Sequence, residues 1–260
     1  MACCGYRKNT GIKCAPIINE TPTNHSQNAC PRLNTHYTYF LILAASLAGP
    51  LALSFDKKVA FYKKWKYIFP AMLVPALLYI AWDMFFTMKG VWSFNLDYIT
   101  GYAVGNLPLE EVLFFFVVPY CCLFIYECIR SYFPGLKQKA GADLFLQGLA
   151  LILLVASFFY RDQYYTSWTF LFTAFFIGLL YSLPSFFKGF DAVSFLVSYA
   201  ITVIPFLLVN GFLTAIPVVI YNDLENSGIR IYTIPFEDVF YGMLLMLMIV
   251  AIYERGLKRN

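Results

Sequence analysis

The sequence carries little charge. Only 13% of its 260 residues are Asp, Glu, Lys or Arg, whereas 60% are hydrophobic. A soluble domain has about 25% charged residues, so this composition cannot cover a water-facing surface. The chain is therefore predicted to be an integral membrane protein, with the lipid bilayer as a partner. The net charge of +4 does not indicate a nucleic-acid partner, because the basic residues lie in short loops that membrane topology explains.

Metal and cofactor motifs are also missing. The only histidines are His25 and His36, and no cysteine has a zinc-ligand spacing with them. There is no GxGxxG dinucleotide motif, no aspartate-rich diphosphate cluster, and no lysine in the last apolar segment. These absences argue against a zinc enzyme, a dinucleotide-dependent enzyme, a prenyltransferase and a retinal photoreceptor. We expect neither a metal nor a cofactor. Nor is a disulfide framework recognisable among the cysteines, which are Cys3, Cys4, Cys14, Cys30, Cys121, Cys122 and Cys128.

Seven apolar stretches make up most of the chain. Each is close to the roughly 20 residues that a helix needs to cross a bilayer. They lie at about 37–55, 69–86, 109–127, 143–160, 167–184, 191–209 and 236–253. Residues 1–35 are polar and lack an apolar core, so they are predicted to be a disordered tail and not a signal peptide. The predicted fold class is an all-α membrane protein with seven transmembrane helices.

Lysine and arginine are distributed unequally between the two sides of the predicted membrane domain. One side holds Lys57, Lys58, Lys63, Lys64, Lys66, Arg130, Lys137, Lys139, Lys188, Arg255, Lys258 and Arg259. The other side holds Arg32, Lys89, Arg161 and Arg230. Because basic loops stay on the cytoplasmic side, we predict the N-terminus outside and the C-terminus in the cytoplasm. The host membrane is expected to be a bacterial inner membrane.

The chain contains an internal repeat. The segment NLPLEEVLFFFVVPYCCLFIYE, ending at Glu127, reappears as TIPFEDVFYGMLLMLMIVAIYE, ending at Glu254, after a shift of 127 residues. The pattern predicts two three-helix repeats, at 36–129 and 164–260, joined by a linking helix at 130–163. A unit of three spans needs one linking span to regain its orientation. The repeats are therefore predicted to be parallel, with their acidic motifs at the same membrane face.

Each repeat places two adjacent acids after a proline: Glu110 and Glu111 in the first, Glu237 and Asp238 in the second. Acids in the first turn of a helix suit the helix dipole, so they are open to a purely structural interpretation. Burying an ionised acid at bilayer depth costs roughly 2.5–3.5 kcal/mol, however, which favours a protonated carboxyl that can act as a general acid. Two copies in matching positions favour the catalytic interpretation. Adjacent helical residues point about 100° apart, so one acid of each pair is expected to face a cavity.

Asp83 is a third candidate acid. It lies late in the second span, on the predicted face of the acid pairs, and its repeat mate is Asn210, which cannot donate a carboxyl proton. The alternative is that Asp83 caps its helix or pairs with Lys89. Two further acids, Glu127 and Glu254, end their spans beside basic residues and are interpreted as interfacial anchors.

Aromatic residues make up 20% of the chain. Trp82, Trp92 and Tyr241, together with Asn210, are predicted to bind substrate near the acids. Phe94, Tyr98, Tyr102 and Tyr221 are expected nearby. Membrane interfaces enrich Trp and Tyr in any case, so each residue alone has a structural explanation. Together, aromatic faces beside acids would stabilise a carbocation, as proton-initiated chemistry on an apolar polyene requires.

At these residues the chain resembles the small membrane-bound lycopene cyclases of bacteria and fungi, in their fused form. The matching blocks are FYKKWKYIFPA, AWDMFFTMKGVWSFNLDYITG, NLPLEEVLFFFVVPY and IPFEDVFYG. The resemblance implies a lycopene β-cyclase that protonates an acyclic end group and closes a ring without redox change. It carries the family's acidic roles to the four paired acids and to Asp83, with Glu110 and Glu237 preferred because the first acid is identical in both repeats.

Alternatives remain open from sequence. A carotenoid hydratase would capture the same cation with water and form a tertiary alcohol. A non-enzymatic seven-helix protein, such as a transporter, would share the parallel repeats. The expected partner is lycopene or another acyclic carotenoid, and homo-oligomers or association with other carotenoid enzymes are compatible with the sequence.

Overall fold

Seven α-helices make up most of the part of the protein that the structure describes. The computed structural model describes residues 35–136 and 140–258. The helices are α1 (Thr38–Leu53), α2 (Trp65–Lys89), α3 (Leu109–Tyr132), α4 (Ala140–Phe159), α5 (Tyr164–Ser182), α6 (Ala192–Ala215) and α7 (Glu237–Lys258). Each coincides with one predicted apolar stretch. The part of the predicted tail that holds His25 and four cysteines lies outside the described residues. The described cysteines, Cys121, Cys122 and Cys128, are free thiols.

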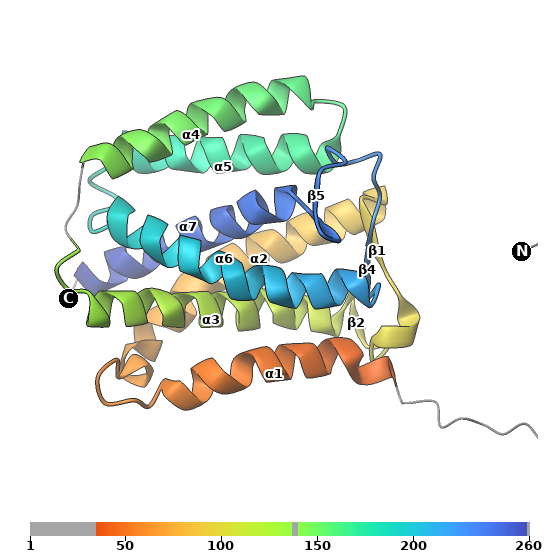
Figure 1. Cartoon of the computed structure of the whole chain (residues 1–260), viewed down its shortest axis with the longest axis horizontal. Coiled ribbons are helices and arrows are strands. Elements are labelled where there is room, and N and C mark those ends of the chain that lie inside the picture. The colour runs from red at the N-terminus through yellow and green to blue at the C-terminus, as the bar shows by residue number, and fades with distance from the viewer. Residues whose placement is uncertain (1–34, 137–139, 259–260) are drawn as a thin grey trace, which may run out of the picture. The chain divides into compact units, whose positions relative to one another are not determined.

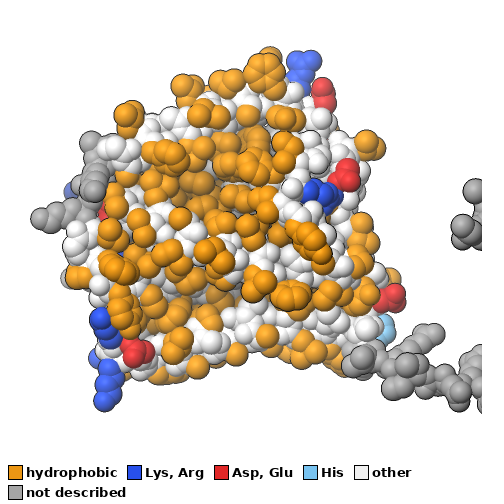
Figure 2. Space-filling model, in the orientation of Figure 1, with side chains coloured by type: hydrophobic (Ala, Val, Ile, Leu, Met, Phe, Trp, Pro, Cys, Tyr) orange, Lys and Arg blue, Asp and Glu red, His pale blue; other side chains and the backbone are white. Residues whose placement is uncertain are grey.

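Six of the helices in the described part are long and apolar enough to cross a membrane, and α5 is the exception. The first turns of α5 contain tyrosine, threonine, serine and tryptophan, which lower its mean hydropathy. On the face shown in Figure 2, hydrophobic side chains cover the middle and charged side chains gather toward the ends of the helices. This arrangement fits a membrane protein.

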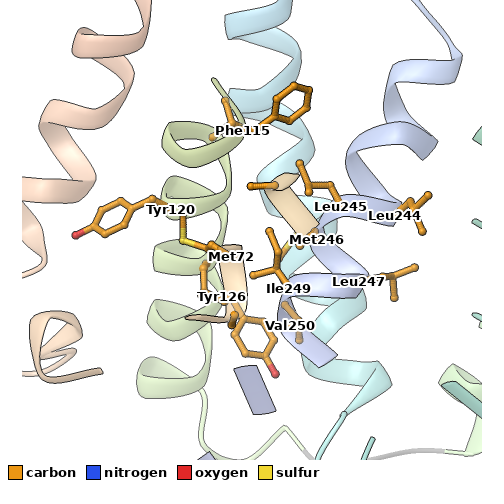
Figure 3. Packing of buried hydrophobic residues seen from close by; sticks show 14 of the residues in the cluster. Met72, Phe115, Tyr120, Tyr126, Leu244, Leu245, Met246, Leu247, Ile249 and Val250 are labelled. Atoms are coloured by element: carbon orange, nitrogen blue, oxygen red, sulfur yellow. The ribbon is translucent and has the colours of Figure 1, made fainter. Parts of the chain in front are cut away.

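The helices pack around α3 and α7. Helix α1 packs on α3 and α5 packs on α7, while α2 contacts α7 and α3 contacts α6. Figure 1 shows α4 and α5 side by side at one edge of the bundle and α1 at the opposite edge. Figure 3 shows side chains of α3 and α7 in the core, with Tyr120 pointing away from α7. The Tyr120 hydroxyl reaches the hydroxyl of Ser54, just after α1, at 2.6 Å.

Six short strands and three short 3-10 helices, which the sequence did not predict, complete the described elements. The strands are β1 (Trp92–Phe94), β2 (Ala103–Val104), β3 (Leu107–Pro108), β4 (Val219–Tyr221), β5 (Arg230–Ile231) and β6 (Ile234–Pro235). The 3-10 helices are η1 (Thr35–Tyr37), η2 (Phe61–Lys64) and η3 (Leu96–Tyr98). The strands form three antiparallel pairs, β1–β4, β2–β3 and β5–β6.

The pairing of β1 with β4 places Ser93 opposite Ile220, its own mate at the 127-residue shift. The hairpins β2–β3 and β5–β6 follow the same shift. Their turns contain Gly105, with φ of 64°, and its mate Tyr232, with φ of 60°. A left-handed tyrosine is uncommon, so the hairpin geometry prevails over the residue's own preference.

Glu127 and Glu254, interpreted from sequence as interfacial anchors, are buried instead. The hydroxyl of Tyr253 donates to Glu127 at 2.8 Å, and the hydroxyl of Tyr126 donates to Glu254 at 3.1 Å. Arg130 forms ion pairs with both carboxylates, and Lys64 pairs with Glu127. The cluster thus fastens α3 to α7 at the end of the bundle away from the paired acids. The sequence interpretation failed because it considered each span separately and not the contact between them.

Candidate active site

A mostly apolar pocket lies between α2, α3, α6 and α7, closed at one end by β1 and β4. Its cavity volume is about 60 Å³. The carboxyl-bearing residues that line it are Asp83 from α2, Glu111 from α3 and Asp238 from α7. All three are buried. Because an unpaired charge is costly in apolar surroundings, the partners of each carboxyl decide what it can do.

The first acid of each pair points away from this pocket. Glu110 Oε1 accepts a hydrogen bond from the Thr100 amide at 2.7 Å, and Glu237 Oε1 accepts one from the Ser227 amide, also at 2.7 Å. Glu237 Oε1 also accepts from the Thr166 hydroxyl at 2.5 Å. These acids bind the loops that precede the β2–β3 and β5–β6 hairpins. The helical 100° offset between neighbours explains why the second acid faces the pocket instead.

Asp238 accepts three hydrogen bonds. Tyr165 donates to Oδ1 at 2.5 Å, while Asn210 and Tyr221 donate to Oδ2 at 3.1 and 3.0 Å. Burial and the neighbouring Asp238 raise the pKa of Tyr221 well above its ordinary value, so its phenol keeps the proton that it donates. Neutral donors of this kind stabilise a carboxylate without adding a positive charge.

Glu111, the mate of Asp238, accepts one hydrogen bond from a described residue, the Tyr39 hydroxyl at 2.7 Å. Tyr39 corresponds to Tyr165 with an offset of 126 residues, which relates α1 to α5. The two other donors of Asp238 are lost in this half of the pocket. Phe94 stands where the other half has Tyr221, and Asp83 stands where it has Asn210. The second difference was predicted from sequence, whereas the first was not.

Asp83 adds a second carboxyl to the half of the pocket with fewer donors. Its Oδ2 is buried and has no hydrogen-bond partner among the described residues. In the same part of the chain no ion pair joins Asp83 to Lys89, whose amine lies over the Phe85 ring. The pairing alternative from sequence is therefore wrong. Asp83 and Glu111 interact electrostatically, and so do Glu111 and Asp238.

Aromatic rings form much of the remaining wall. Trp92, Tyr241 and Asn210, predicted to bind substrate, line the pocket, whereas Trp82 lies behind it with its ring 5.2 Å from that of Tyr241. The Tyr241 hydroxyl is buried and unpartnered within the described chain. Tyr102, expected near the acids, is 72% exposed. The sequence did not predict that Tyr39 and Tyr165 belong to the site, because they correspond at an offset of 126 residues and the gapless 127-residue shift does not align them.

Metal ligation finds no support in this geometry. Within residues 35–136 and 140–258, no group of three or more His, Cys, Asp or Glu side chains is placed to hold a metal ion.

Comparison with known proteins identifies the family. The family model described as "Lycopene cyclase" matches the chain twice, at residues 36–129 and 162–255. Searches of curated proteins and of solved structures find no significant match. The two matched segments contain all three pocket carboxyls and cover most of the chain. This chain belongs to the lycopene cyclase family.

Proposed function

We propose that the protein is a lycopene β-cyclase that closes acyclic carotenoid end groups to β-ionone rings by proton transfer. The observation that carries the proposal is the unequal partnering of three carboxyls in one apolar pocket. A proton-initiated cyclisation needs one group that gives a proton and another that receives one. The two halves of the pocket differ in the hydrogen-bond donors that they offer their carboxyls, and therefore in which carboxyl keeps a proton.

The half with Asp83 and Glu111 is assigned the acid. Two carboxyls that interact in an apolar space cannot both be ionised cheaply, so the pair retains a proton. The unpartnered Oδ2 of Asp83 makes it the donor of choice. Glu111, held by Tyr39, is its positioning partner.

Asp238 is assigned the base. Its three donors favour the ionised form, in which it attracts a cation and accepts a proton. This assignment replaces the preference for Glu110 and Glu237. Those two acids bind loop amides and do not line the pocket, so they are proposed to shape the site and not to touch substrate.

The reaction balances as an isomerisation. Asp83 gives a proton to the terminal double bond, which leaves a tertiary cation. The electron pair of the internal alkene forms the ring carbon–carbon bond and moves the cation into the ring. Asp238 removes a ring proton, and the electron pair of that bond becomes the ring double bond. The proton then returns to the acid pair, so no oxidant or reductant is consumed.

The pocket walls suit the cationic stages. Trp92 and Tyr241 offer ring faces and edges beside the carboxyls, and a cation within about 6 Å of such a face is attracted by roughly 0.5–2 kcal/mol. The apolar surroundings also exclude water. A hydratase needs a water molecule at the same cation, and the mostly apolar lining favours ring closure over that reaction.

The membrane arrangement remains part of the proposal. We place all seven helices across the bilayer, with α5 as the fifth span because it packs along α4 and α7. The recurrence of strand register, glutamate–amide bonds and tyrosine–glutamate bonds at the 127-residue shift supports two parallel repeats. The N-terminus is proposed to lie outside and the C-terminus in the cytoplasm.

Expression in lycopene-accumulating cells, followed by chromatography of the pigments, tests the function. Carotenoids with one or two β-rings are expected. A tertiary alcohol would indicate a hydratase. Unchanged lycopene, in cells that contain the membrane-inserted protein, would reject the proposal and leave a non-catalytic role such as transport.

A further inference from the structure

A second cavity, of about 680 Å³, lies beside the pocket, between α1, α3 and α6. Val118, Cys122, Thr202 and Phe206 line both cavities. The two spaces therefore adjoin at these four side chains, and the second one is here named the lateral groove.

The lateral groove opens on the side of the bundle. Leu41 of α1 and Leu208 of α6 both line it and are each 61% exposed. Both helices are apolar and long enough to cross a membrane, so the opening faces lipid and not water. Along α1 the lining runs from Thr38 to Pro50, which is about 18 Å at 1.5 Å per residue. The groove is much longer than one end group requires.

The corresponding position in the other half of the protein holds two large aromatic rings. There, between α2 and α5, the ring of Trp82 lies 5.1 Å from the ring of Phe172. Trp82 corresponds to Val209 at the 127-residue shift, and Phe172 corresponds to Ser46 at the offset of 126 that relates α1 to α5. Val209 and Ser46 both line the lateral groove. Two large rings thus close one side, while two small side chains leave the other side open.

We propose that the lateral groove is a portal from the bilayer that holds the long polyene chain while one end group lies at the acids. This inference rests on the proposed cyclase function. A linear hydrocarbon fits the site because the lining is almost wholly apolar and the groove adjoins the reacting pocket at four shared side chains. The equivalent position between α2 and α5 is occupied by aromatic rings, so the described part of the protein has one such opening for the polyene. The two ends of a carotenoid are therefore processed one at a time.

The portal is tested by closing it with the residues of the other half. The double variant Ser46→Phe with Val209→Trp recreates the aromatic pair, and Val209→Phe alone is a milder closure. We expect conversion of lycopene in isolated membranes to fall at least about tenfold in the double variant, in keeping with lost substrate binding. Ile204→Trp is the matched control, because Ile204 lies on α6 but outside the groove, and should leave conversion unchanged. Full conversion by the folded double variant would overturn the portal.

Photocrosslinking provides a readout that needs neither catalysis nor the bulky variants. The photoreactive residue p-benzoylphenylalanine replaces Leu208 at the rim or Ile204 outside it, and membranes are loaded with lycopene. Illumination should attach the polyene at position 208 several-fold more than at position 204. Equal labelling at both positions would overturn the portal even in an active cyclase. Selective labelling in a protein without cyclase activity would support the portal and reject the proposed function, so the two failures are distinguishable.

Discussion

The two halves of the pocket share a framework but differ in their polar groups. In one half, Asp238 is held by two tyrosines and an asparagine. In the other, Glu111 keeps one tyrosine, and the asparagine has become Asp83. One pocket therefore has two unlike walls. The proposed proton-initiated cyclisation needs a proton donor and a proton acceptor, and two identical walls would not supply them.

The largest effect is expected for Asp83→Asn, which places beside Glu111 the amide that Asn210 supplies beside Asp238. General acid catalysis contributes about 10²–10⁴-fold, so cyclisation should fall at least 100-fold. The measurement is pigment chromatography from cells with matched protein levels. Asn210→Asp is the mirror variant and should retain more activity, because the Asp83 acid remains. Near-normal ring formation by the Asp83→Asn protein would show that Asp83 is not the general acid.

A smaller effect is expected when the half of the pocket with Asp238 is made like the half with Asp83 and Glu111. Tyr221→Phe copies Phe94 and removes one donor from Asp238. A hydrogen bond to a charged group contributes about 1.5–3 kcal/mol, so activity should drop roughly tenfold or more. The reverse change, Phe94→Tyr, offers Glu111 a second donor and should change the rate less than Tyr221→Phe does, because ionised Glu111 leaves the proton of the pair on Asp83. Initial rates in isolated membranes measure both variants, and an unchanged rate in Tyr221→Phe would show that the number of donors to Asp238 does not matter.

The cluster at the other end of α3 and α7 should affect stability more than chemistry. Glu254→Ala leaves the Tyr126 hydroxyl without its acceptor and removes an ion pair of Arg130. We expect a loss of about 1–3 kcal/mol in unfolding free energy, with activity per folded molecule nearly unchanged. Thermal unfolding in detergent measures the loss, and Asp162→Ala, at an 87% exposed carboxylate, is the control. A stable Glu254→Ala protein that has lost activity would instead connect the cluster to catalysis.

The smallest effect is expected at the loop-binding acids. In Glu110→Gln, the amide oxygen still accepts from the Thr100 backbone, so activity should stay within about threefold of the original. Glu237→Gln should behave alike, since its bond to Ser227 is equivalent. Cyclisation rates of both variants, measured at matched protein levels, test this expectation. Loss of activity in both variants, comparable with that of Asp83→Asn, would return the catalytic role to the first acids.

Sequence predicted the seven described helices well because each lies in a long apolar run. It also predicted that neighbouring acids would point in different directions, since this follows from helix geometry. It preferred Glu110 and Glu237 because they are identical in both repeats. In the structure the identical acids hold equivalent loops, and the pocket is where the repeats differ. Identity between repeats therefore marked a shared structural contact.

Other features depend on contacts that no local pattern encodes. The strands are two or three residues long, too short for an alternating pattern, and β1 pairs with a strand from the other half of the chain. The hydrogen bonds of Tyr39 and Tyr165 join residues more than seventy positions apart. The burial of Glu127 and Glu254 requires α3 and α7 to be neighbours. These features are properties of packing between the two halves.

The most direct test of the account is cyclisation of supplied lycopene by isolated membranes in heavy water, with mass spectrometry of the products. Carboxyl protons exchange with solvent between turnovers, so each new β-ring should carry a single deuterium from the acid pair. The product should otherwise keep the mass of lycopene, as an isomerisation requires. Rings formed without deuterium, or products that have gained water, would contradict a cyclase that begins with proton transfer from Asp83.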